Sequence, residues 1–176
     1  MTVEVMLDLE TLSTRADAAI LQIAAASFDE SGTILDTFNV HVRRSSGHID
    51  INTVLWWMSQ PSAREQSDRC QHGQTLQQAL ELFRIWYETV DPDALWAHGA
   101  TFDFPILTSA FEREAMRVPY SYRDLMCTRP IYGLVGGVPN VLLPKGYVRH
   151  DALSDVRLQI AQLTEARRRI GVLRDL

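Results

Sequence analysis

The sequence lacks several features that mark whole classes of protein. It has only two cysteines, Cys70 and Cys127, which stand far apart without metal-ligand spacing, so neither a disulfide-stapled scaffold nor a cysteine-bound zinc is expected. No segment comes close to the ~20 apolar residues that a membrane-spanning helix needs. Repeats, low-complexity tracts and linkers are also missing. Residues 1–176 therefore predict one domain with a core of ordinary size.

A secretion signal and a surplus of positive charge are missing as well. The first residues have no basic start and no apolar stretch, which together with free thiols predicts a cytoplasmic protein. The formal net charge of −5 disfavours tight, nonspecific binding of long duplexes. Among the 17 basic residues only Lys145 is a lysine, a bias that we attribute to codon usage.

The hydrophobic pattern changes along the chain from a strand period to a helical period. Strands are expected at 4–10, 20–28 and 34–42, as an antiparallel meander with short turns, and again at 94–97 and 122–126. Helices are expected at 51–58, from Pro61, at 76–90, at 104–115 and around Leu153 to Leu163. This order predicts an α/β fold, a mixed five-stranded sheet flanked by helices.

Two carboxylates, Asp8 and Glu10, stand two apart on the first expected strand. Alternation places both side chains on the same face, where they repel each other unless a cation lies between them. Carboxylate oxygens are the ligands by which proteins hold Mg²⁺. The alternative interpretation is a strand that simply ends in polar residues.

A third carboxylate, Asp103, stands where a strand passes through Gly99 toward an expected helix. Here the ordinary interpretation is an N-cap, supported by Pro105 near the first helical turn. A metal ligand is compatible with that position, because helix N-termini favour negative groups.

The last pair, His150 and Asp155, lies at the start of the final expected helix. Five residues turn a helix by roughly 140° from one side chain to the other, so we expect His150 on the preceding loop and Asp155 one turn inside the helix. The alternative is a solvated helix start capped by Asp151 or Ser154.

In this order, the five residues resemble the pattern of the DEDDh group of DnaQ-like 3′→5′ exonucleases. The resemblance covers the whole chain and is sharper to the branch of T-even phage exonuclease A and mycobacterial exoribonuclease-like proteins. The segments that carry it are LDLETL at 7–12, AILQI at 19–23, VLWWMSQ at 54–60, WAHGATFDFPIL at 96–107, DLMCTR at 124–129 and HDALSD at 150–155. Phe104 stands where this branch often has a polar residue, and His98 stands where it often has asparagine. Both departures put the substrate preference in doubt.

The resemblance implies an RNase H-like fold and a mechanism with two divalent cations, Mg²⁺ or Mn²⁺. It implies Asp8 as the bridging ligand, Glu10 and Asp155 on the first metal, Asp103 on the second and His150 as general base. Two such cations would cancel four carboxylates and bring the net charge from −5 to −1. The expected substrate is the 3′ end of single-stranded DNA or RNA, cut to nucleoside 5′-monophosphates.

Substrate contacts are expected at Thr11, Leu12, Trp57, Phe104, Arg129 and Lys145. One tryptophan of the pair 56–57 is expected in the core and the other against a base, since stacking suits sequence-tolerant binding of single strands. Two other functions stay open, an RNase H-like endonuclease and a nucleic-acid-binding module without chemistry. A homodimer is expected from base rates alone.

Overall fold

The computed structural model describes residues 2–43 and 47–174, and at its centre lies a five-stranded sheet of order β3-β2-β1-β4-β5. The strands are β1 (Glu4–Thr11), β2 (Ile20–Phe28), β3 (Ile34–His41), β4 (Ala94–Ala97) and β5 (Leu125–Cys127). The first three pair antiparallel, while β4 pairs parallel to β1 and β5 parallel to β4. The expected mixed sheet is confirmed, although β5 begins three residues later than predicted.

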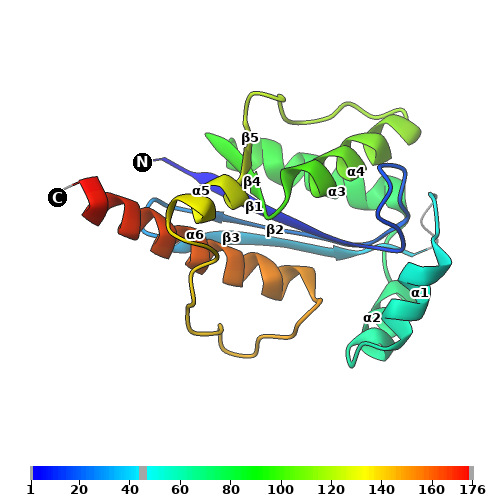
Figure 1. Cartoon of the computed structure of the whole chain (residues 1–176). Coiled ribbons are helices and arrows are strands. Elements are labelled where there is room, and N and C mark those ends of the chain that lie inside the picture. Colours follow the sequence, from blue (N-terminus) through cyan, green and yellow to red (C-terminus); the bar gives the residue numbers. More distant parts are fainter. Residues whose placement is uncertain (1, 44–46, 175–176) are drawn as a thin grey trace.

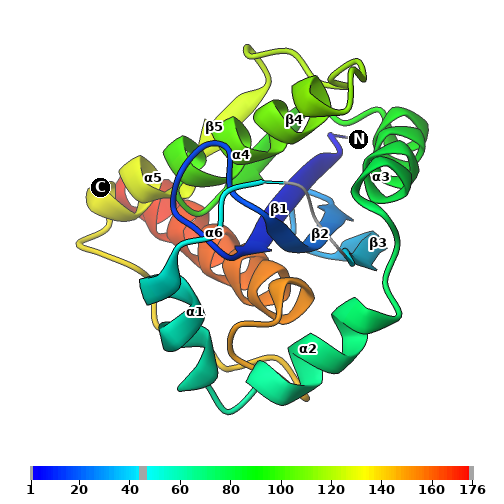
Figure 2. The same ribbon diagram turned by 90° about the vertical axis from the view of Figure 1, so that its right-hand side faces the viewer.

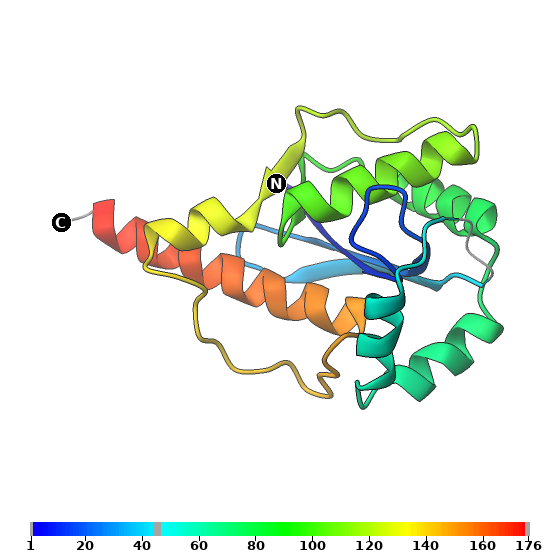
Figure 3. The same ribbon diagram turned by 45° about the vertical axis from the view of Figure 1, so that its right-hand side comes forward.

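Helices cover both faces of this sheet and one of its ends (Figures 1 and 2). They are α1 (Ile51–Met58), α2 (Ala63–Gln71), α3 (Leu76–Val90), α4 (Ala100–Arg113), α5 (Thr128–Leu134) and α6 (Ala152–Arg174). One face packs against α3 and α4 and the other against α6, while α1 and α2 lie beyond the end of the sheet where β1 finishes (Figure 3). None of the helices in the described ranges is long and apolar enough to cross a membrane.

The alternation of β1 decides which face carries its polar residues. Leu7 and Leu9 point into the core formed with α3 and α4, whereas Met6 points into the core formed with α6. Asp8 and Glu10 continue the series of Met6, so both carboxylates face α6. The C-terminal half of β1 therefore presents two carboxylates on one face of the sheet, as the sequence predicted.

Two features near the site differ from the prediction. α4 begins at Ala100 rather than at 104, because Gly99 adopts a left-handed conformation (φ 109°) and turns the chain into the helix at once. Pro105, interpreted above as a helix start, therefore lies within α4. The short helix α5 was not predicted, because Pro130 and Gly133 lower its helix propensity.

Candidate active site

Asp8 and Glu10 lie near the end of β1, where Glu10 is buried and Asp8 is half-buried. The Nε2 of Gln159 on α6 donates to Asp8 Oδ1 at 2.8 Å. Burial first, and then the charges of Asp103, Glu10 and Asp155, raise the pKa of Asp8 well above its usual value. Burial and the neighbouring carboxylates, Asp155 foremost, raise the pKa of Glu10 to about 8. Both acids are thus costly to ionise in the absence of a cation.

Asp103 approaches the same strand end from the opposite helix layer. Its Oδ1 accepts a hydrogen bond from the backbone N–H of Leu9 at 3.2 Å. This amide lies beyond the end of β4, whose last residue pairs with Leu7, so the carboxylate takes over where the ladder stops. Burial raises the pKa of Asp103 to about 7, although hydrogen bonds from backbone amides and the charge of Arg129 oppose the rise.

The N-cap interpretation of Asp103 is wrong, because the cap of α4 is Gly99 and Asp103 lies inside the first turn. From there its side chain is directed at β1, and it is 97% inaccessible to solvent (3% exposed). A buried carboxylate is uncommon unless a positive charge, such as a metal ion, pairs with it.

His150 and Asp155 come to the site together from the start of α6, in the places that the sequence predicted. His150 ends the preceding loop with a left-handed backbone (φ 59°), and Asp155 follows one turn inside the helix. Asp155 Oδ2 accepts from the backbone N–H of His150 at 3.2 Å, and its Oδ1 accepts from the hydroxyl of Tyr147 at 2.7 Å. Ligand atoms of Glu10, His150 and Asp155 all lie within 4.8 Å of one another.

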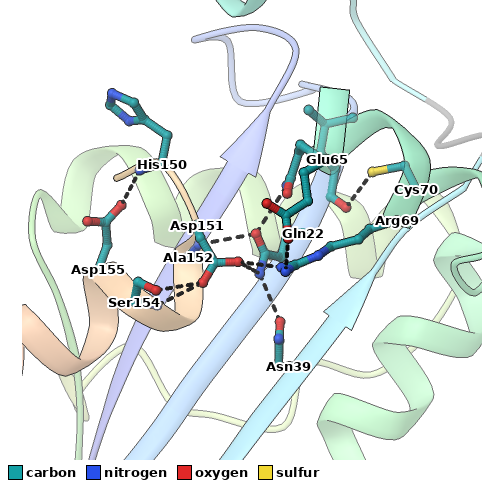
Figure 4. Close-up of polar contacts among 12 residues, drawn as sticks. Gln22, Asn39, Glu65, Arg69, Cys70, His150, Asp151, Ala152, Ser154 and Asp155 are labelled. Carbon is teal, nitrogen blue, oxygen red and sulfur yellow. Dashed lines mark hydrogen bonds and ion pairs between the residues drawn. The ribbon is translucent and has the colours of Figure 1, made fainter. Parts of the chain in front are cut away.

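A buried network fixes the start of α6 to the sheet and to α2 (Figure 4). Gln22 on β2 is fully buried, and its Oε1 accepts from the backbone N–H of Ala152 and from Gln66 Nε2, both at 3.1 Å. Its Nε2 donates to Asp151 Oδ2 at 3.2 Å and also to Asn39 on β3.

Asp151 joins this network to the helix itself. Its Oδ1 accepts from the backbone N–H of Ser154 at 3.0 Å, so the capping role considered for Asp151 is confirmed and coexists with the His150–Asp155 arrangement. Arg69 on α2 forms an ion pair with Asp151 at 3.0 Å. The strained backbone at His150 is therefore held by tertiary contacts rather than by local preference.

The expected substrate contacts fall into buried and exposed groups. Thr11 is buried, and its hydroxyl donates to the Ser13 carbonyl at 2.7 Å, while Leu12 is half-buried. Trp57 is buried, with its indole N–H donating to the Thr11 carbonyl at 2.8 Å, and Phe104 lies in the core against α3 and α4. Both rings expected at the substrate are thus buried in the packing of the fold.

The exposed aromatic residue of the pair is Trp56. The residue is 42% exposed. Its indole ring lies edge-on against the His150 imidazole, with 4.8 Å between the two ring centroids. Arg129 and Lys145 are exposed as expected, and the guanidinium of Arg129 lies where a Cβ on Gly99 would meet it at 3.1 Å. His98, the other departure noted above, is partly buried and hydrogen-bonded to Thr128 at 2.9 Å.

Two residues beside the carboxylates, Gln22 and Gln159, were not singled out as site residues from the sequence. Gln22 could have been found, because it is the one polar side chain in the apolar run at 20–26 and a buried amide needs partners. Gln159 gives no comparable signal, since a glutamine within a helix such as α6 is ordinary.

Comparison with known proteins agrees with this geometry. The model of the Rv2179c-like 3′–5′ exoribonuclease domain matches residues 3–166. The chain belongs to this family. It is also 24% identical over 201 residues to an exodeoxyribonuclease of Enterobacteria phage T4, an alignment that covers 93% of this chain and 88% of the phage protein. Family membership makes the chain a 3′→5′ exonuclease and confirms the resemblance read from the motifs.

Solved structures share the fold of this Rv2179c-like domain at low sequence identity. Exonuclease I of E. coli, in complex with a dT13 oligonucleotide, superposes with a TM-score of 0.72 at 15% identity. The alignment covers 99% of this chain but only 43% of exonuclease I. The nuclease domain of 3′hExo, described as a DEDDh family member bound to rAMP, superposes with a TM-score of 0.61 at 12% identity and covers 94% of this chain and 92% of that one. The α/β, RNase H-like architecture is confirmed.

Proposed function

We propose that this exonuclease removes nucleotides from the 3′ end of single-stranded DNA or short RNA with two divalent cations, Mg²⁺ or Mn²⁺. The observation that carries the proposal is the convergence of Asp8, Glu10, Asp103 and Asp155 at one end of β1, with the pKa of each raised by burial. Such a set is destabilising when it stands ionised, and hard divalent cations with oxygen ligands relieve it. We include residues 1–176 in this one exonuclease domain.

The four carboxylates divide naturally between two cations. Asp8 is close enough to Glu10, Asp103 and Asp155 for all three charges to raise its pKa, and we propose that it would serve both cations. Glu10 and Asp155 would hold one cation and Asp103 the other. When bound, such cations lower the pKa of an attacking water and stabilise negative charge on the leaving 3′ oxygen.

In this scheme His150 would accept the proton of the attacking water. Burial lowers the pKa of His150 while Asp155 opposes the shift, so the imidazole is largely neutral at neutral pH and able to act as a base. Its position beside Glu10 and Asp155 places it at the carboxylate cluster rather than on open surface. The product is a nucleoside 5′-monophosphate.

The substrate strand would enter past Trp56, the exposed ring that borders His150. Stacking on this ring suits any base. Arg129 and Lys145 are candidate phosphate contacts, with Arg129 close to Asp103. An exonuclease I structure holds a dT13 oligonucleotide and the 3′hExo domain holds rAMP, which supports single strands of either sugar.

The test uses 5′-labelled single-stranded DNA and RNA of one sequence, incubated with Mg²⁺ or Mn²⁺. We expect a ladder that shortens from the 3′ end, absent with EDTA and absent for Asp8→Ala, and the faster ladder names the preferred sugar. Internal fragments without mononucleotides would instead indicate an endonuclease. No degradation of either strand with either metal would refute catalysis and leave a binding module.

A further inference from the structure

Gln159 stands one helical turn after Asp155 on α6 and shares its face of the helix. The side chain is buried, with 8% of the residue exposed, and its Nε2 donates to Asp8 Oδ1 at 2.8 Å. This hydrogen bond joins residues 151 positions apart, across the interface between β1 and α6.

The other half of the same amide has no partner. Gln159 Oε1 is buried and accepts no hydrogen bond within the described parts of the chain. A buried acceptor without a donor destabilises the fold, so packing alone would favour leucine or methionine at this position. The amide is oriented toward Asp8 despite that cost, which indicates a function for the contact.

We propose that Gln159 is a positioning residue that fixes the Asp8 carboxylate for metal binding, an inference that rests on the function proposed above. An ionised carboxylate has about four acceptor sites. Gln159 occupies one of them and leaves the others for the cations.

A purely structural role would give a different pattern of effects. Beyond the backbone hydrogen bonds of α6, Gln159 has one other hydrogen bond to the described residues: its backbone carbonyl accepts from the Tyr132 hydroxyl at 3.5 Å, which does not depend on the side chain. Substitution by methionine retains the volume and removes only the donor and the unpaired acceptor. A change in metal affinity then measures the loss of the contact with Asp8. A change in the stability of the metal-free protein measures the effect on packing.

The experiment compares Gln159→Met with Gln162→Met, the same exchange at a partly exposed position of α6. Titration calorimetry with Mn²⁺ gives the metal affinity, thermal unfolding in EDTA gives the stability, and oligonucleotide kinetics at saturating Mn²⁺ separate kcat from KM. We expect Gln159→Met to weaken Mn²⁺ binding by roughly 10- to 100-fold, as loss of an outer partner of a metal ligand does. Its unfolding temperature in EDTA is at or above the wild-type value, because the unpaired acceptor is gone, and its KM for the oligonucleotide is unchanged; Gln162→Met matches the wild type throughout.

Two further variants keep the result decisive. Gln159→Asn retains the amide on a shorter side chain, so it should lose Mn²⁺ affinity as Gln159→Met does. In an Asp8→Asn background, Gln159→Met should cause no further loss. Wild-type Mn²⁺ affinity in both single variants, with an active wild-type enzyme, would overturn the role of Gln159 alone. Absence of metal binding and degradation by the wild type would overturn the proposed function itself.

Discussion

Replacing Glu10 by glutamine should stabilise the metal-free protein at neutral pH. The pKa of Glu10 is about 8 in the fold against 4.5 as its ordinary value, because burial and neighbouring carboxylates oppose its ionisation. The folded state therefore binds the proton more tightly than the unfolded chain does. The stability that this proton provides is fully present below pH 4.5 and is lost as the pH rises to about 8.

The magnitude follows from the same two values. Each pKa unit corresponds to about 1.4 kcal/mol, so the 2.5 units between 4.5 and pH 7 give a cost of about 3 kcal/mol at pH 7, because folded Glu10 retains a proton that the unfolded chain has released. Glutamine has nearly the same shape and no charge, so it escapes this cost. For a domain of 176 residues, 1 kcal/mol shifts the unfolding temperature by about 2–4 °C, which predicts a rise of about 6–12 °C at pH 7.

The assay is thermal unfolding in EDTA at pH 5 and pH 7, with Glu112→Gln as the control at an exposed position of α4. At pH 5 the advantage of Glu10→Gln should shrink below about 1 kcal/mol. Saturating Mg²⁺ should reverse the order, because only the wild type has the full ligand set to gain from binding. An equal advantage at both pH values, or none at pH 7, would refute the assignment of Glu10 to a buried, mutually repelling cluster.

Four other substitutions separate catalysis, substrate binding, core packing and the positioning of α6. His150→Gln should lower kcat by roughly 10²- to 10⁴-fold and remove the acidic limb of the pH–rate profile, while Mn²⁺ affinity stays within a few-fold of the wild type; an unchanged profile would exclude His150 as the base. Trp56→Ala should weaken single-strand binding by about 1–3 kcal/mol in a fluorescence anisotropy titration without unfolding the protein. Trp57→Ala should instead destabilise the fold by about 3–5 kcal/mol in urea unfolding, and the reverse assignment would show that the wrong ring was placed at the substrate. Gln22→Leu leaves the Ala152 amide and the Gln66 amide unpaired and should cost about 2–4 kcal/mol of stability; a neutral result would mean that the network does not hold the start of α6.

The parts of the site that depend only on the periodicity of a single strand or helix can be predicted from the sequence. Alternation along β1 puts Asp8 and Glu10 on one face, and the turn per residue of a helix separates His150 from Asp155. Both follow from bond geometry that any strand or helix shares. The same local reasoning placed the β2 strand and α3 at the bounds that the structure has.

Features that depend on the ends of elements and on contacts between distant segments could not be predicted. Asp103 binds the Leu9 amide only because β4 stops opposite Leu7, a property of strand register that the local pattern does not contain. Burial of Trp57 rather than Trp56 depends on a hydrogen bond to the Thr11 carbonyl, 46 residues away. The aromatic residues alone do not say which ring faces outward.

The long helix α6 supplies His150's neighbour Asp155 and the amide of Gln159, while Asp8 and Glu10 lie among the first ten residues. During synthesis, a chain whose residues beyond 149 have not yet emerged from the ribosome holds only part of the acidic set. On the assignment of Asp155 proposed above, nuclease chemistry requires α6 to be docked on the sheet. A nascent chain would thus acquire the proposed activity only after α6 has been made.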